Sequence, residues 1–324
     1  MRLWKVSTFS FAFGTRHAYD YRPLKVFRRY DPMTQFPEGG ASLAALRQRI
    51  DALDAELHTL LMERARVIEG IVAAKRASGA AGPVFRPDRE ADMMRQLVER
   101  HDSDLPILTI EHLWREIITS CTGLQAPFTV HLDGSADLLG LLDVARFYFG
   151  FSTGLEVAGD QADVVGIVAA SPNDLGLIAL TDRADLPWWR GLTETGARII
   201  ARVPYLMMED RPADLPALVI GRPVPVETVL ETHVYDARWA GALPGRLMDQ
   251  GIEVLSFHRS HQGVDALLAV SAELPDTAVF ELCELAGAEP DVLRRVGGYA
   301  APIDVEGEAD EEFDETAQTA SEGL

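Results

Sequence analysis

The feature that most constrains the fold is a long run of apolar residues at heptad spacing that begins after Ser42. Such spacing is typical of an α-helix that packs lengthwise along another helix. Ser42 is a fair N-cap, and Gly79, Gly82 and Pro83 end the pattern. A helix of about 36 residues is roughly 54 Å long, which is too long for a small isolated domain. The apolar positions are Leu43, Leu46, Ile50, Leu53, Leu57, Leu60, Val67, Ile71 and Ala74.

One position of this apolar seam is a cation, Arg64. Lys75 follows 11 residues later and, at 100° per residue, returns to within about 20° of the same direction. Arg47 lies 17 residues before Arg64 and points roughly 100° away. A cation on such a helix is commonly a surface charge with a buried stem. The shared stripe favours instead an anion pocket that Arg47 completes from a second molecule.

Two shorter helices are predicted next. The first begins at Arg86-Pro87, has Asp88 and Glu90 near its positive end, and runs to about residue 100. The second begins near Thr109, a fair N-cap, and is stopped by proline at 127. It places Cys121 and Gln125 one turn apart on one face.

The order of long helix, helix and helix resembles the all-helical class of chorismate mutase over residues 42–126. The resemblance rests on Leu-Arg-Gln-Arg-Ile-Asp-Ala-Leu-Asp at 46–54 and on Pro-Asp-Arg-Glu at 87–90. It implies an all-α module that forms an intertwined homodimer. It also implies an isomerase of the shikimate pathway that converts chorismate to prephenate, for phenylalanine and tyrosine synthesis, with no metal and no cofactor.

The resemblance also implies the site residues. Arg64 and Arg47 of the partner subunit would hold the two substrate carboxylates, and Lys75 and Gln125 would donate to the ether oxygen. Glu90 would accept the ring hydroxyl. An amide at 125 donates at any pH, so we expect activity from neutral into mildly alkaline solution. The catalytic residues would be Lys75, Gln125 and Arg64, and the substrate-binding residues Arg47, Arg64, Lys75, Arg86, Arg89, Glu90, Cys121 and Gln125.

Two of these positions depart from the family's pattern. Arg86 replaces an acidic residue, and Cys121 replaces a small hydroxyl residue. Cys121 is most simply a small buried hydrophobe. Isochorismate pyruvate lyase has a similar fold and cationic pocket and is an alternative activity, and a non-catalytic regulatory or ligand-sensing protein is a third.

The second half alternates strand-like and helical stretches, so the chain is predicted to be multidomain, all-α followed by α/β. Residues 127–225 resemble a prephenate dehydratase domain whose signatures are missing, because Leu132 to Asp137 replaces its Gly-Pro-Glu-Gly-Thr-Phe loop. We therefore expect no dehydratase activity. The strand-like runs are Phe128 to Leu132, Val164 to Ala170, Leu175 to Leu180, Ala197 to Ala201 and Ala217 to Ile220.

Residues 226–303 resemble an ACT-like regulatory module of βαββαβ order, in which Gly241-Ala242-Leu243 would open the first helix. Phe257-His258-Arg259-Ser260 stands where phenylalanine-regulated relatives keep Glu-Ser-Arg-Pro, so regulation by phenylalanine or tyrosine is left open. His258 and His261 are expected at the surface, and Trp188 and Trp189 in the packing.

Composition narrows the partners. The net charge of −20 argues against nucleic acid, and no apolar run approaches the roughly 20 residues of a membrane span. The two cysteines fit a cytoplasmic protein. Residues 304–324 contain nine acidic residues and are predicted to be a disordered tail. Residues 1–41 are predicted to be an extension, with Met1 or Met33 as the start.

Overall fold

The computed structural model describes residues 42–78, 85–224 and 228–306. The three predicted helices are α1 (Leu43–Ser78), α2 (Pro87–Arg100) and α3 (Ile107–Gln125). Ser42 caps α1, because its Oγ accepts a hydrogen bond from the backbone N of Ala45 at 3.2 Å. The expected cap at Thr109 is wrong, since α3 begins two residues earlier, directly after Pro106.

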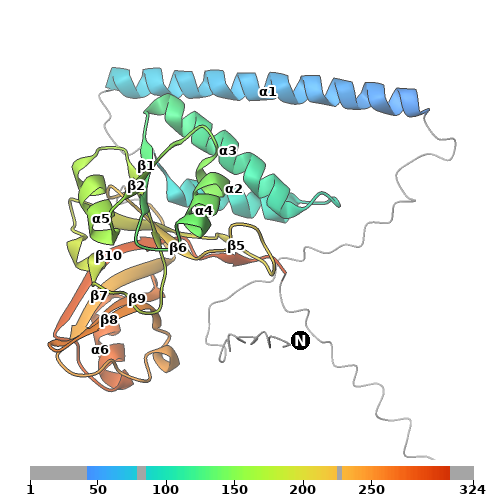
Figure 1. Cartoon of the computed structure of the whole chain (residues 1–324). Coiled ribbons are helices and arrows are strands. Elements are labelled where there is room, and N and C mark those ends of the chain that lie inside the picture. The colour runs from blue at the N-terminus through green and yellow to red at the C-terminus, as the bar shows by residue number, and fades with distance from the viewer. Residues whose placement is uncertain (1–41, 79–84, 225–227, 307–324) are drawn as a thin grey trace, which may run out of the picture.

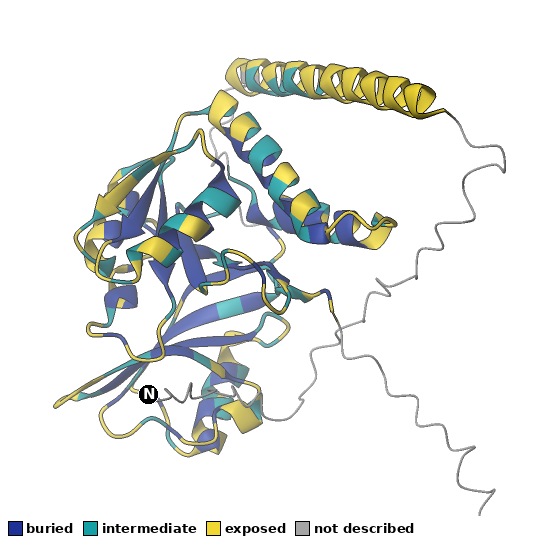
Figure 2. Cartoon of the chain, turned by 45° about the vertical axis from the view of Figure 1, so that its right-hand side comes forward, coloured by how far each residue is buried: buried dark blue, intermediate teal, exposed yellow. Residues whose placement is uncertain are grey.

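Helix α1 lies along one side of the molecule, above α3 (Figure 1). Its second half packs against α3, whereas every residue from 43 to 63 is exposed (Figure 2). Within the described ranges, no helix is long and apolar enough to cross a membrane.

The second region follows α3 and contains all the other helices and strands of the described residues. In chain order its elements are β1 (Thr129–Asp133), α4 (Leu138–Phe149), β2 (Gly154–Ala158), α5 (Gln161–Ala170), β3 (Leu175–Ala179), η1 (Trp188–Gly191), β4 (Arg198–Val203), β5 (Leu206–Met207), β6 (Ala217–Gly221), β7 (Thr232–Trp239), η2 (Met248–Gln250), β8 (Glu253–Ser260), β9 (Gly263–Ser271), α6 (Asp276–Ala286), β10 (Val292–Tyr299) and β11 (Ile303–Asp304).

Nine of these strands form one continuous sheet in the order β2-β1-β3-β6-β4-β10-β7-β9-β8. Strands β1, β2 and β3 are parallel and are joined by α4 and α5, whereas β6 is antiparallel to both of its neighbours. Among the last four strands of this order, each neighbouring pair is antiparallel. Strands β5 and β11 form a separate parallel pair.

Each face of the sheet buries its own apolar core. On one face, α5 and η1 cover a core that includes the buried Trp188 and Trp189. On the other face, α4 and α2 cover the strands from β1 to β4, and α6 covers β7 and β9. The expectation that the two tryptophans are packing residues is confirmed.

One predicted strand is wrong. The run from Val164 to Ala170 belongs to α5, which begins after Asp160, whose carboxylate accepts a hydrogen bond from the backbone N of Asp163 at 2.9 Å. A short apolar run does not distinguish a buried strand from a buried helix. Here the N-cap Asp160 favours the helix. The other four runs lie on β1, β3, β4 and β6.

The last four sheet strands and α6 follow the predicted order except at one place. The helix expected from Gly241 is absent, and only the three-residue η2 lies between β7 and β8. Pro244 and Gly245 explain this, because both disfavour a helix interior. The acidic tail was placed too early, since Asp304 is in β11 and Val305 is buried. Residues 1–41 and 307–324 lie outside the described residues.

Candidate active site

The second half of α1 presents one half-buried face to α3. At 100° per residue, the positions on this face and Lys75 fall within about 120° of one another. The predicted cationic stripe therefore lies where the two helices meet. The half-buried residues of α1 are Arg64, Ala65, Ile68, Ile71 and Val72.

Two polar contacts join the helices at this face. Arg64 Nη1 donates to Sγ of Cys121 at 2.7 Å, and Lys75 Nζ donates to Oε1 of Gln125 at 3.4 Å. Gln125 Nε2 donates to the carbonyl oxygen of Cys121 at 3.4 Å. Four of the eight predicted site residues thus lie together. In sequence, Cys121 is 57 residues after Arg64, and Gln125 is 50 residues after Lys75.

The cluster is suited to an anion. In the described part of the chain, no carboxylate lies within ion-pair distance of Arg64, whose side chain contacts Sγ of Cys121. A half-buried guanidinium with this environment can form a bidentate pair with a carboxylate. In the same part, no group of three His, Cys, Asp or Glu side chains converges to hold a metal ion.

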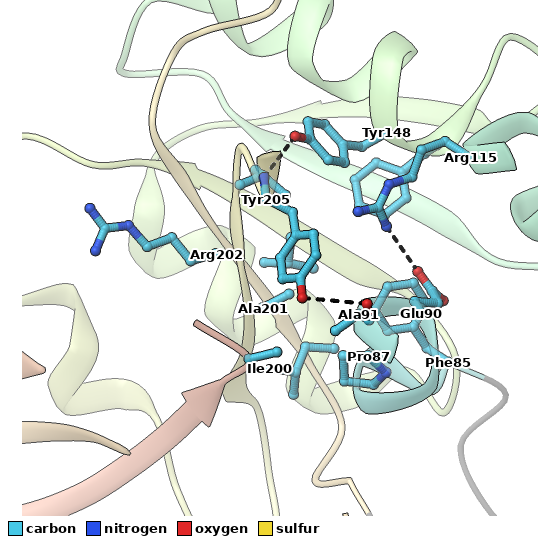
Figure 3. A pocket seen from close by; sticks show the side chains of 14 residues that line it. Phe85, Pro87, Glu90, Ala91, Arg115, Tyr148, Ile200, Ala201, Arg202 and Tyr205 are labelled. Atoms are coloured by element: carbon cyan, nitrogen blue, oxygen red, sulfur yellow. Dashed lines mark hydrogen bonds and ion pairs between the residues drawn. The ribbon is translucent and has the colours of Figure 1, made fainter. Parts of the chain in front are cut away.

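Glu90 makes its contact with Arg115 of α3. It is 9% exposed, and its Oε2 accepts a hydrogen bond from Arg115 Nη1 at 3.3 Å (Figure 3). Burial raises the pKa of Glu90 to about 7, while Arg115 opposes this shift and Asp88 adds to it. Glu90 therefore carries a proton part of the time at neutral pH.

The remaining predicted residues make another contact or are exposed. Arg86 precedes α2 and pairs with Asp88 at 3.2 Å, and Arg89 is exposed on the first turn of α2. Arg47 is exposed, and the 17 residues between it and Arg64 correspond to about 26 Å along the helix. Arg47 cannot reach the Arg64 cluster of its own chain.

Sequence reasoning missed a second set of charges. Glu111 and Arg115 of α3 are 1% and 8% exposed, and Arg211, from the segment between β5 and β6, is 5% exposed. A signal was present for the first two, since Glu111 and Arg115 share the i, i+4 face with apolar Ile118. Nothing in the sequence indicated Arg211 as their partner.

The helical part of the chain matches a known family. Residues 46–126 match the chorismate mutase type II family. The chain therefore contains a chorismate mutase type II domain, followed by a large mixed α/β region.

Two known proteins are similar to part of this chain. The bifunctional chorismate mutase/prephenate dehydratase of Pseudomonas aeruginosa is 38% identical over 91 residues, which are 27% of this chain and 25% of that protein. The protein of the same description from Aquifex aeolicus is 30% identical over 141 residues, which are 42% of this chain and 38% of that protein. The matches thus span well under half the length of these relatives.

Two solved structures match about half of the chain. GqqA, described as a novel type of quorum quenching acylase, is 12% identical with a TM-score of 0.36, over 53% of this chain and 95% of that one. Prephenate dehydratase from Arthrobacter aurescens, in complex with L-Phe, is 10% identical with a TM-score of 0.34, over 55% and 92%. Scores this low do not assign the second region to either protein.

Proposed function

We propose that this chain is a chorismate mutase that rearranges chorismate to prephenate in phenylalanine and tyrosine synthesis. The observation that carries the proposal is the cluster of Arg64, Lys75, Cys121 and Gln125, inside a domain that matches the chorismate mutase type II family. The rearrangement is concerted and needs no nucleophile. A protein accelerates it by holding the flexible side chain over the ring and by stabilising charge on the ether oxygen.

The roles follow from the chemistry of each group. Arg64, which Cys121 contacts, binds one carboxylate of chorismate through its planar fork. Lys75 and Gln125, which lie within hydrogen-bond distance of each other, donate to the ether oxygen. Glu90 accepts the ring hydroxyl, and Arg86 and Arg89 frame the entrance with positive charge.

The second carboxylate requires Arg47 of the partner subunit in a homodimer. The exposed apolar side chains of α1 support this, because a contiguous apolar patch marks an interface. Leu53 and Leu57, for example, are 40% and 59% exposed. In such a dimer, each pocket combines Arg64 of one chain with Arg47 of the other.

Mixing two inactive variants tests this shared pocket. Arg47→Ala and Arg64→Ala chains are each inactive as homodimers. After mixing and subunit exchange, every heterodimer contains one intact pocket, so activity returns to about a quarter of wild type by random pairing. No recovery under conditions where exchange is demonstrated contradicts the shared pocket.

The activity itself is tested by following the loss of chorismate in the ultraviolet, with the full-length chain. Turnover no faster than the uncatalysed reaction contradicts the proposal. Isochorismate is supplied in a parallel assay, in which release of pyruvate identifies the lyase activity instead. Loss of chorismate without pyruvate release from isochorismate supports the mutase.

We further propose that the second region has lost prephenate dehydratase activity and keeps a packing or regulatory role. The stretch from Leu132 to Asp137 supports this, because it replaces the Gly-Pro-Glu-Gly-Thr-Phe loop of the dehydratase family. Within it, Asp133 at the end of β1 is fully buried, and its carboxylate accepts hydrogen bonds from Ser135 Oγ at 2.6 Å and Gln161 Nε2 at 2.9 Å. The names of the bifunctional relatives favour the opposite expectation. Formation of phenylpyruvate from prephenate by the purified chain would show that the dehydratase is intact.

A further inference from the structure

A buried chain of alternating charges lies beside α3, whose Glu111 and Arg115 are about 80° and 120° around the helix from Cys121. It runs from Arg211 through Glu111 and Arg115 to Glu90, and none of the four is more than 9% exposed. Arg211 Nη2 lies 3.4 Å from Glu111 Oε2, Glu111 Oε1 lies 3.7 Å from Arg115 Nη2, and Arg115 Nη1 lies 3.3 Å from Glu90 Oε2. Three helical residues are thus connected to one residue of the α/β region.

Helix α4 fixes the two guanidinium groups of this chain. The Arg115 guanidinium lies 4.9 Å from the ring centre of Tyr148, and that of Arg211 lies 5.1 Å from the ring centre of Phe147. Arg211 also donates to the carbonyl oxygen of Leu206. These contacts restrict both cations to one orientation.

Packing alone does not fix the carboxylate of Glu90. A cavity of about 40 Å³ adjoins it, between α2 and β4, and is also lined by Arg115, Tyr148 and Tyr205 (Figure 3). Such a volume holds about three water molecules and is too small for chorismate. The direction of the Glu90 carboxylate therefore depends on its contact with Arg115.

We propose that Arg115 is a positioning residue for Glu90, and that Arg211 holds Arg115 in place through Glu111. The α/β region thereby completes the mutase site, which the helical module does not complete alone. This inference rests on the proposed function, in which Glu90 accepts the ring hydroxyl of chorismate.

The same contact sets the charge of Glu90. An ionised carboxylate is the stronger acceptor, and burial, which raises the pKa of Glu90 to about 7, opposes ionisation. Arg115 from α3 lowers this pKa, and Asp88 from α2 raises it. The phenols of Tyr148 and Tyr205 have raised pKa values and stay neutral. Displacing Arg115 therefore raises the pKa further and moves the acid limb of activity to higher pH.

The test uses full-length Arg211→Met and measures kcat and KM for chorismate across about pH 5 to 9. We expect kcat at neutral pH to fall about tenfold or more, and the acid limb to move upward. Arg211→Lys keeps the positive charge, so the pH of its acid limb should lie close to that of the wild type. The matched control is Arg95→Met, which removes another contact between the regions, the ion pair of Arg95 on α2 with Glu231. It should leave the profile unchanged.

The outcomes separate the two proposals. An inactive wild-type chain contradicts the proposed function, whereas an active wild type with an unmoved limb in Arg211→Met contradicts the charge chain alone. An equal shift in Arg95→Met also overturns it. If Arg211→Met fails to fold by circular dichroism, the double variant Glu111→Gln/Arg211→Met leaves no buried charge of that pair unmatched, and the same upward shift is expected.

Discussion

The first half of α1 and strand β3 both carry leucine and isoleucine side chains, but these side chains differ completely in exposure. Leu53 and Leu57 of α1 are 40% and 59% exposed, whereas Leu177 and Ile178 of β3 are fully buried. Strand β3 is covered on both faces by helices of its own chain, and the first half of α1 is not (Figure 2). The sheet region therefore buries its apolar side chains within one chain, whereas the first half of α1 leaves its leucines exposed, where we propose that a partner subunit packs.

The largest expected effect concerns the second half of α1. Arg64→Ala removes the cation that would bind a substrate carboxylate, and we expect kcat/KM to fall on the order of 10² to 10³-fold. Arg66→Ala is the matched control, because Arg66 is an exposed arginine of the same helix. Steady-state kinetics with chorismate measure both. Equal losses in the two variants would remove Arg64 from the site.

Two leucine truncations then test the comparison of stability directly. Leu177→Ala creates a cavity beneath α4 and should lower the free energy of unfolding by about 2 to 5 kcal/mol. Leu57→Ala should change it by less than about 0.5 kcal/mol in dilute protein. Denaturant unfolding measures both. If Leu57→Ala is as costly at the lowest protein concentration, α1 is buried within a single chain after all.

Charges among the exposed leucines in the first half of α1 should separate the subunits. Leu53→Asp with Leu57→Asp places carboxylates on the apolar face, and we expect the dissociation constant of the dimer to rise about 100-fold or more. Sedimentation equilibrium measures the mass, and the melting of the sheet region should be unaffected. Asp54→Asn, elsewhere on the same turn, serves as the control. A wild-type chain that is monomeric at micromolar concentration argues against the dimer.

The smallest expected effect is a pH dependence introduced at α3. Gln125→Glu replaces an amide donor by a carboxyl that donates only when protonated, with an ordinary pKa of about 4.3. The activity of the variant, divided by that of the wild type at the same pH, should therefore decline by roughly 80-fold between pH 5 and 7. Taking this ratio removes the acid limb that Glu90 gives to both proteins. Gln125→Met, which donates at no pH, should be low throughout. A constant ratio of Gln125→Glu to wild type would show that residue 125 does not donate in the transition state.

The helical half of the fold was readable from local patterns. The heptad spacing, Ser42 and Pro87 predicted α1 and α2, because caps and periodicity act within a few residues. The same reasoning misassigned Val164 to Ala170, where an apolar run fits both a strand and a helix. It also predicted a helix after Gly241, although Pro244 and Gly245 oppose one.

The site was only partly readable in the same way. Helical geometry placed Arg64 and Lys75 on one face, and Cys121 and Gln125 on another, without showing that the faces meet. It gave no sign that Glu90 pairs with Arg115, or that Arg211 reaches Glu111 across 100 residues of sequence. Such contacts depend on how separate elements pack, which no local spacing encodes.

By itself, the sequence determined the long amphipathic helix, the two shorter helices and the stripe of cations, because each follows from the 3.6-residue repeat of the α-helix. The tertiary structure decided which faces of those helices are covered. It brought Arg64 to Cys121 and Lys75 to Gln125, left the first half of α1 exposed, and buried Glu90 in a chain of charges that ends in the α/β region. Burial and pairing of charges arise only when distant segments pack together, and this is why the sequence alone did not reveal them.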